Sequence, residues 1–189
     1  MDSSKPARKT KLDKALALFQ EAYDRQLSGE IDAAITLYRA SIEQHPTAEA
    51  HTFLGWTYSF LGRLDDAIAE CRKAIDVDPG FGNPYNDIGA YLIEMERLDE
   101  AIPWLEQATA APRYESYQFP WFNLGRAYEG KEQLNRAVAC FERSLEHDNA
   151  YAPALKAKSF KELARALNGG SLAEARGDAP AAPPAAAAA

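Results

Sequence analysis

The chain has 189 residues, of which 47% are hydrophobic, and a formal net charge of −7 at pH 7. A chain of this length can bury one substantial core or a short array of repeats. No apolar run approaches the ~18–20 residues that cross a bilayer. The N-terminus is charged where a signal peptide is apolar, so the sequence predicts a cytoplasmic protein that does not insert into membranes.

The acidic charge is concentrated in the body of the chain. Residues 15–154 contain 11 basic and 23 acidic side chains, a net charge of −12. Such a surface repels nucleic acid and favours basic or neutral partners. Plain solubility explains the same charge equally well.

The residues that bind metals or cofactors in other proteins show no suitable pattern here. Cys71 and Cys140 are interpreted as free buried thiols, which fits a reducing compartment. His45, His51 and His147 do not have the spacing of metal ligands. The sequence therefore predicts no metal and no cofactor.

Read in chain order, the sequence divides into three parts. Residues 1–10 are basic and lack apolar periodicity, so they are predicted to be disordered. Residues 11–168 are predicted to be a domain of amphipathic helices, twelve to fourteen residues each, joined by short turns. Residues 169–189 are rich in Ala and Pro and are predicted to be a disordered tail.

A pattern of about 34 residues recurs four times within the helical part. Its copies align on a pair of small residues twelve positions apart: Ala22/Ala34, Gly55/Ala67, Gly89/Ala101 and Gly125/Ala137. Self-similarity at this period indicates a solenoid of stacked helix pairs. Only Gly or Ala allows two helix backbones to approach closely, so each pair is predicted to mark a helix crossing. The fold class is therefore all-α.

These copies resemble the tetratricopeptide repeat family, most clearly in the stretches AHTFLGWTYSFLGRLDDAIAECRKAIDVDP and WFNLGRAYEG. The resemblance covers roughly residues 15–151 and implies a right-handed α-solenoid of stacked antiparallel helix pairs. Repeats are expected at about 15–47, 48–81, 82–117 and 118–151, followed by a capping helix over residues 153–167.

In this family the first helix of each repeat lines a concave groove that binds peptides. Carried over to this chain, the resemblance implies a groove that favours an apolar peptide bearing Lys or Arg. Phe53 and Phe122 are instead expected to pack between repeats. The residues expected to face the groove are Phe19, Tyr23, Thr52, Trp56, Phe60, Asn83, Asn86, Asp87, Ile93, Phe119, Asn123, Arg126 and Glu129.

One known use of the family is disfavoured. Members that bind acidic chaperone C-terminal tails clamp the carboxylates with Lys, Asn and Arg at fixed groove positions. In one alignment those positions hold Thr52, Trp56, Asp87, Phe119 and Asn123; in the other they hold Phe19, Tyr23, Phe53, Asn83 and Asp87. Neither set contains a basic residue, so an acidic tail would meet Asp87 without compensation.

Enzymatic motifs are absent from the sequence, which has no Gly-rich phosphate loop and no nucleophile motif. The prediction is a non-catalytic scaffold or adaptor that binds a peptide segment. Two alternatives stay open: a chaperone that shields an aggregation-prone client, and a structural subunit whose repeats form oligomer contacts.

Overall fold

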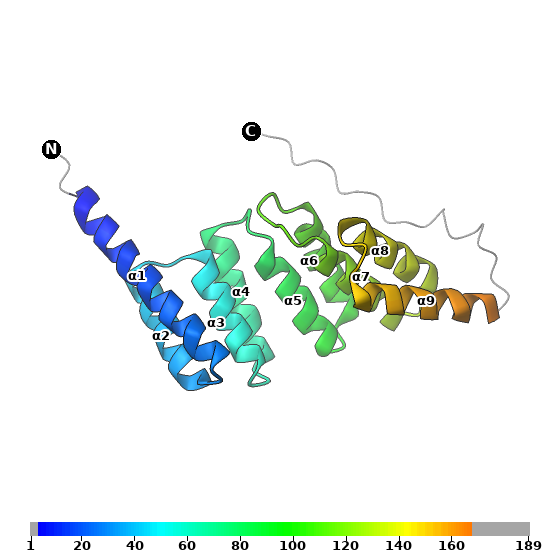
Figure 1. Ribbon diagram of the computed structural model, residues 1–189, viewed down its shortest axis with the longest axis horizontal. Coiled ribbons are helices and arrows are strands. Elements are labelled where there is room, and N and C mark those ends of the chain that lie inside the picture. Colours follow the sequence, from blue (N-terminus) through cyan, green and yellow to red (C-terminus); the bar gives the residue numbers. More distant parts are fainter. Residues whose placement is uncertain (1–3, 168–189) are drawn as a thin grey trace. The chain divides into compact units, whose positions relative to one another are not determined.

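The computed structural model describes residues 4–167 of the chain, with side chains for residues 10–159 and 161. The residues described form helices joined by short connections (Figure 1). The helices are α1 (Ser4–Leu27), α2 (Ile31–Gln44), α3 (Ala48–Ser59), α4 (Leu64–Val77), α5 (Asn83–Glu94), α6 (Leu98–Ala110), α7 (Gln118–Gly130), α8 (Leu134–His147) and α9 (Ala152–Leu167). None of the described helices is long and apolar enough to cross a bilayer.

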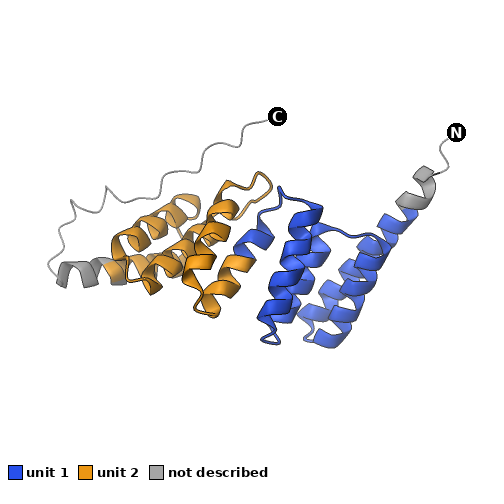
Figure 2. Cartoon of the chain, turned by 180° about the vertical axis from the view of Figure 1, so that it is seen from behind, with its two compact units in different colours: residues 1–87 blue, residues 88–189 orange. Residues whose placement is uncertain are grey.

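The chain divides into two compact units, residues 1–87 and 88–189, with the boundary inside α5 (Figure 2). In the first unit α1 packs on α2, α2 on α3, and α3 on α4. In the second unit α6 packs on α7, α7 on α8, and α8 on α9. Within each unit these helices pack on their neighbours in sequence, which confirms the predicted all-α helical-repeat solenoid.

Close contact inside the second, third and fourth helix pairs depends on glycine in the first helix. A Cβ atom on Gly89 would lie 2.4 Å from Cδ2 of Leu105, and one on Gly125 would lie 2.2 Å from Cε1 of Phe141. At Gly55 the obstacle is a backbone oxygen of α4 at 2.9 Å. Leu105 and Phe141 each lie four residues after the alanine of the sequence pattern. In repeats three and four, the large side chain one turn beyond that alanine therefore requires the glycine.

The turn between the two helices of a pair uses the same backbone conformation in every repeat. One residue there has a positive φ: Gly29 (77°), Gly62 (68°), Glu96 (58°) and Glu132 (59°). Glycine adopts this conformation without steric cost, whereas glutamate does so against its preference. Repeats three and four therefore place an acidic side chain where repeats one and two have none.

Helix α1 begins at Ser4, inside the segment for which the sequence predicted disorder. The stretch KPARKTKLDKALALF is rich in Lys, Ala and Leu, which are strong helix formers and favour this early start of the helix. Residues 1–3 and the predicted tail at 169–189 lie outside the described residues. The predicted domain boundaries stay predictions.

Substituting Gly89 tests the repeat register. Gly89→Leu should lower the free energy of unfolding by at least about 2 kcal/mol, because α5 and α6 must separate to accommodate the new side chain beside Leu105. Urea denaturation monitored by circular dichroism measures this loss.

The matched control for this substitution is Ala69→Leu, which adds the same side chain at an exposed position of α4. It should change the free energy of unfolding by less than about 0.5 kcal/mol. Equal stabilities for the two variants would show that Gly89 is not at a close helix crossing.

Candidate peptide-binding surfaces

Five aromatic rings of α1, α3 and Phe60, the residue that follows α3, form a continuous surface in the first unit, hereafter the aromatic surface. Phe53 is central: its ring centroid lies 5.2 Å from that of Phe19, 5.6 Å from that of Tyr23 and 5.7 Å from that of Trp56, and all three contacts are edge-to-face. Phe60 continues the row, with its centroid 5.0 Å from that of Trp56. Edge-to-face pairs of this kind hold aromatic rings in defined orientations.

Exposure increases along this row toward the C-terminal end of α3. Tyr38 of α2 is buried at its base, 5.5 Å from Phe19, and its hydroxyl donates to Oε1 of Gln26 at 2.8 Å. Burial also raises the pKa of Tyr38, which keeps the hydroxyl protonated as a donor. At the outer end Trp56 is 38% exposed and Phe60 is 54% exposed. Two large rings are therefore fixed from behind and open to solvent.

The polar residues expected beside this surface are less accessible. Thr52 is only 4% exposed and its hydroxyl donates to the Ala48 carbonyl oxygen at 2.8 Å, so its side chain is not available to a partner. This corrects the expectation for Thr52, because a threonine hydroxyl inside a helix readily bonds the preceding turn. Asn83, the first residue of α5, and Asn86 are half-buried.

Asp87 is half-buried next to Asn86, whose Nδ2 donates to its Oδ1 at 3.3 Å. Burial raises the pKa of Asp87 to about 7, and the hydrogen bond from Asn86 offsets only part of that effect. The carboxyl group therefore titrates near neutral pH, which no feature of the sequence indicated.

The second unit has a smaller cluster of rings near the start of α7. Tyr151 contacts Phe119 at 5.6 Å and Phe122 at 5.3 Å, both edge-to-face, and Phe122 also packs on the buried Phe141 at 5.7 Å. Phe119 is 39% exposed. Phe122 therefore packs between helices, as Phe53 does in the first unit.

Further along α7 lies an open hollow of about 560 Å³, hereafter the Arg126 hollow. It is built by the C-terminal ends of α5 and α7 and the start of α6, and three of the predicted groove residues, Ile93, Arg126 and Glu129, face it together. Its lining residues are Ile93, Glu96, Leu98, Arg126, Glu129 and Gly130.

Asn123, predicted to face the groove, is only 8% exposed. Its Oδ1 accepts a hydrogen bond from Nη1 of Arg126 at 3.1 Å, so it positions the arginine and does not itself reach a partner. Glu129 is paired with Lys161 of α9 at 2.5 Å. The expectation of an open asparagine is thus corrected, because α7 turns this side chain inward.

Sequence reasoning missed an open hollow of about 360 Å³ between α2, α3 and α4 that contains charged side chains. There the buried Glu70 lies 2.7 Å from Nδ1 of His51 and 2.7 Å from Nζ of Lys73. Burial raises the pKa of Glu70, but the hydrogen bonds with His51 and Lys73 outweigh burial and lower it. No signal could have found this cluster, because His51 and Glu70 are nineteen residues apart on different helices.

Comparison with known proteins agrees with this fold. Family models described as tetratricopeptide repeat match residues 20–80, 83–113 and 119–151, together more than half of the chain. The chain belongs to the tetratricopeptide repeat family. Membership of this family makes it a protein-interaction module.

Similar proteins include the small glutamine-rich tetratricopeptide repeat-containing protein 2 of Mycosarcoma maydis, which is 30% identical over 92 residues, 48% of this chain. The chain spans only 26% of the length of that relative.

Among solved structures, PilW, described as a type IV pilus biogenesis factor, matches with a TM-score of 0.74 and 21% identity over 82% of this chain and 71% of that one. A MamA structure matches with a TM-score of 0.69 and 21% identity over 86% of each chain. At such identities these structures show the fold alone.

The raised pKa of Asp87 predicts a specific pH dependence of stability. Its folded pKa of about 7 exceeds the usual value of 3.8, so the folded state retains a proton that the unfolded state releases between these pH values. Stability should therefore fall as pH rises from about 4 to 7. Asp87→Asn should raise the free energy of unfolding by about 1–3 kcal/mol at about pH 8 and change it little at about pH 4.

Chemical denaturation at both pH values measures the Asp87 effect, with Asp76→Asn at an exposed position of α4 as the control. The control should show no pH-dependent gain. A gain at pH 8 that is equal for both variants would contradict the assignment to Asp87.

Proposed function

We propose that this protein is a non-catalytic scaffold or adaptor that binds a peptide segment on the face formed by its first helices, with the aromatic surface as the anchor. The observation that carries the proposal is the exposure of Trp56 and Phe60 at the end of a chain of packed rings. Rigid, exposed aromatic side chains supply most of the binding energy in many protein interfaces at little entropic cost.

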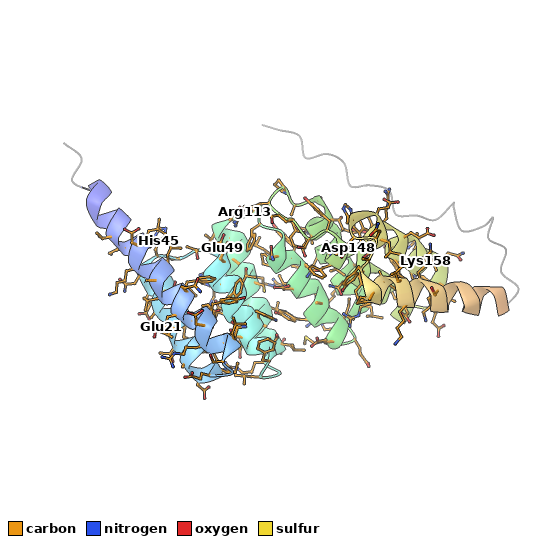
Figure 3. All side chains as sticks on the ribbon, in the orientation of Figure 1. Glu21, His45, Glu49, Arg113, Asp148 and Lys158 are labelled. Carbon is orange, nitrogen blue, oxygen red and sulfur yellow. The ribbon has the colours of Figure 1, made fainter. Side chains whose placement is uncertain are left out.

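Charge supports a partner with basic character. Residues 15–154 carry a net charge of −12. Glu21 of α1 and Glu49 of α3 lie in the same unit as the aromatic surface (Figure 3). An apolar peptide with Lys or Arg would gain attraction from this field as well as contact with the rings.

The two cysteine thiols support a binding role in which neither acts as a nucleophile. Cys71 and Cys140 are both buried and free. Burial raises the pKa of Cys140 to about 12 and the pKa of Cys71 well above its ordinary value, so neither is present as a reactive thiolate. Buried reduced thiols also fit action in the cytoplasm.

Peptide display on the full chain tests this proposal. Dodecapeptides selected from a random library should be enriched in apolar residues together with Lys or Arg. The double variant Trp56→Ala/Phe60→Ala should weaken the selected peptides by at least about tenfold, because it removes two anchor residues. Isothermal titration calorimetry measures these affinities.

The matched control is Val77→Ala, which removes an exposed apolar side chain from α4, a second helix. It should leave the affinities unchanged, and thermal melting should show that both variants are folded. If the double variant binds the peptides as tightly as the native chain, the aromatic surface is not the anchor.

A further inference from the structure

The Arg126 hollow holds a guanidinium group whose hydrogen-bonding capacity is mostly unused. Arg126 is half-buried, and within the described part of the chain its guanidinium donates one hydrogen bond, to Oδ1 of Asn123 at 3.1 Å. A guanidinium carries five N–H donors in a planar fork. Asn123 fixes the arginine from one side and leaves the rest of the fork for a ligand.

The neighbouring acidic residues do not satisfy this arginine. Glu129, one turn further along α7, is paired with Lys161 of α9 at 2.5 Å, so its charge is already balanced. Glu96 lies at the rim and is exposed, in the left-handed turn between α5 and α6. No ion pair joins Arg126 to either carboxylate among the described residues.

The remaining walls of the hollow are aliphatic. Ile93 of α5 and Leu98 of α6 are half-buried and line it together with the backbone of Gly130. A Cβ on Gly130 would lie 2.7 Å from Cδ1 of Leu98, so glycine keeps this wall in place. The hollow thus joins one planar cationic group to a small apolar wall, within a volume of about 560 Å³.

We propose that the Arg126 hollow binds an acidic side chain, Glu or Asp, of the partner segment, with an adjacent aliphatic side chain against Ile93 and Leu98. Carboxylates match the guanidinium fork in a bidentate geometry, which makes this group their preferred ligand. The proposal rests on the proposed function and deepens it: the partner also carries one acidic residue, which this hollow of the second unit selects. The negative charge of Glu96 repels that residue, and it therefore disfavours partner segments that carry clusters of acidic residues.

Two probes that differ only in charge test this assignment on the full chain. They are N-acetyl-Leu-Glu-amide and N-acetyl-Leu-Gln-amide, each titrated to about 20 mM while the Nε–H resonance of Arg126 is followed by NMR. The glutamate probe should shift this resonance saturably, and the glutamine probe should bind at least about fivefold more weakly.

Three variants should change the affinity for the glutamate probe in three different ways. Arg126→Gln should abolish the preference for the glutamate probe, measured by the perturbed resonances of Ile93 and Leu98. Glu96→Gln should tighten the glutamate probe by about two- to threefold, because it removes a like charge from the rim. Glu132→Gln is the matched control, because it changes the equivalent exposed turn residue of the next repeat, and it should have no effect.

Equal binding of the two probes, or an Arg126 resonance that does not move up to the highest concentration, would overturn the proposal. This outcome is distinct from failure of the proposed function, which is measured with the Trp56→Ala/Phe60→Ala variant in the first unit. Suppose that the selected peptides lose affinity for that variant, but bind the native chain equally well with Glu or Gln beside an aliphatic residue. This result would support the proposed function and contradict the proposal for the Arg126 hollow.

Discussion

The structure depends on one steric constraint, the close approach of the two helices in each pair. Gly89 and Gly125 leave room for Leu105 and Phe141, whose side chains occupy the space that a Cβ atom would take. Interiors of proteins are packed too densely to absorb such a clash without moving a helix. Because this contact fixes how each first helix lies on its second helix, it also fixes which side chains of the first helix turn inward and which turn outward.

The aromatic surface follows from this arrangement. Phe53 lies on the inward side of α3, in contact with the buried Tyr38 at 6.2 Å, while Trp56 and Phe60, one and two turns later, reach solvent. The inward rings hold the outward rings in place, so little side-chain entropy remains to be lost when a ligand binds. In the second unit, Asn123 plays the same part for Arg126: a buried side chain orients an accessible one.

Much of the fold could be predicted from the sequence, because its determinants are local and repeated. The Gly/Ala spacing and the turn signals located the helix pairs, but α1 begins earlier than expected. Gly55 meets Ala67 as the spacing predicted, whereas Gly89 and Gly125 meet Leu105 and Phe141 instead of the paired alanine. The candidate site was less predictable. Thr52 and Asn123 lie on first helices, as the other groove residues do, but both are buried. Whether such a side chain is buried depends on its angular position around the helix axis and on the neighbouring helices. The pairing of Lys161 with Glu129 joins residues 32 positions apart in sequence, and no repeat pattern specifies it.

The central claim is that partners bind to the first helices and not to the second. Two tryptophans can show which helices a partner contacts. Trp56 lies on α3, a first helix, and Trp104 lies on α6, a second helix. Indole N–H resonances of both can be followed by NMR as a selected peptide is added to the full chain. The account predicts that the Trp56 resonance shifts to saturation while that of Trp104 stays in place. A shift of Trp104 with Trp56 unchanged would contradict it.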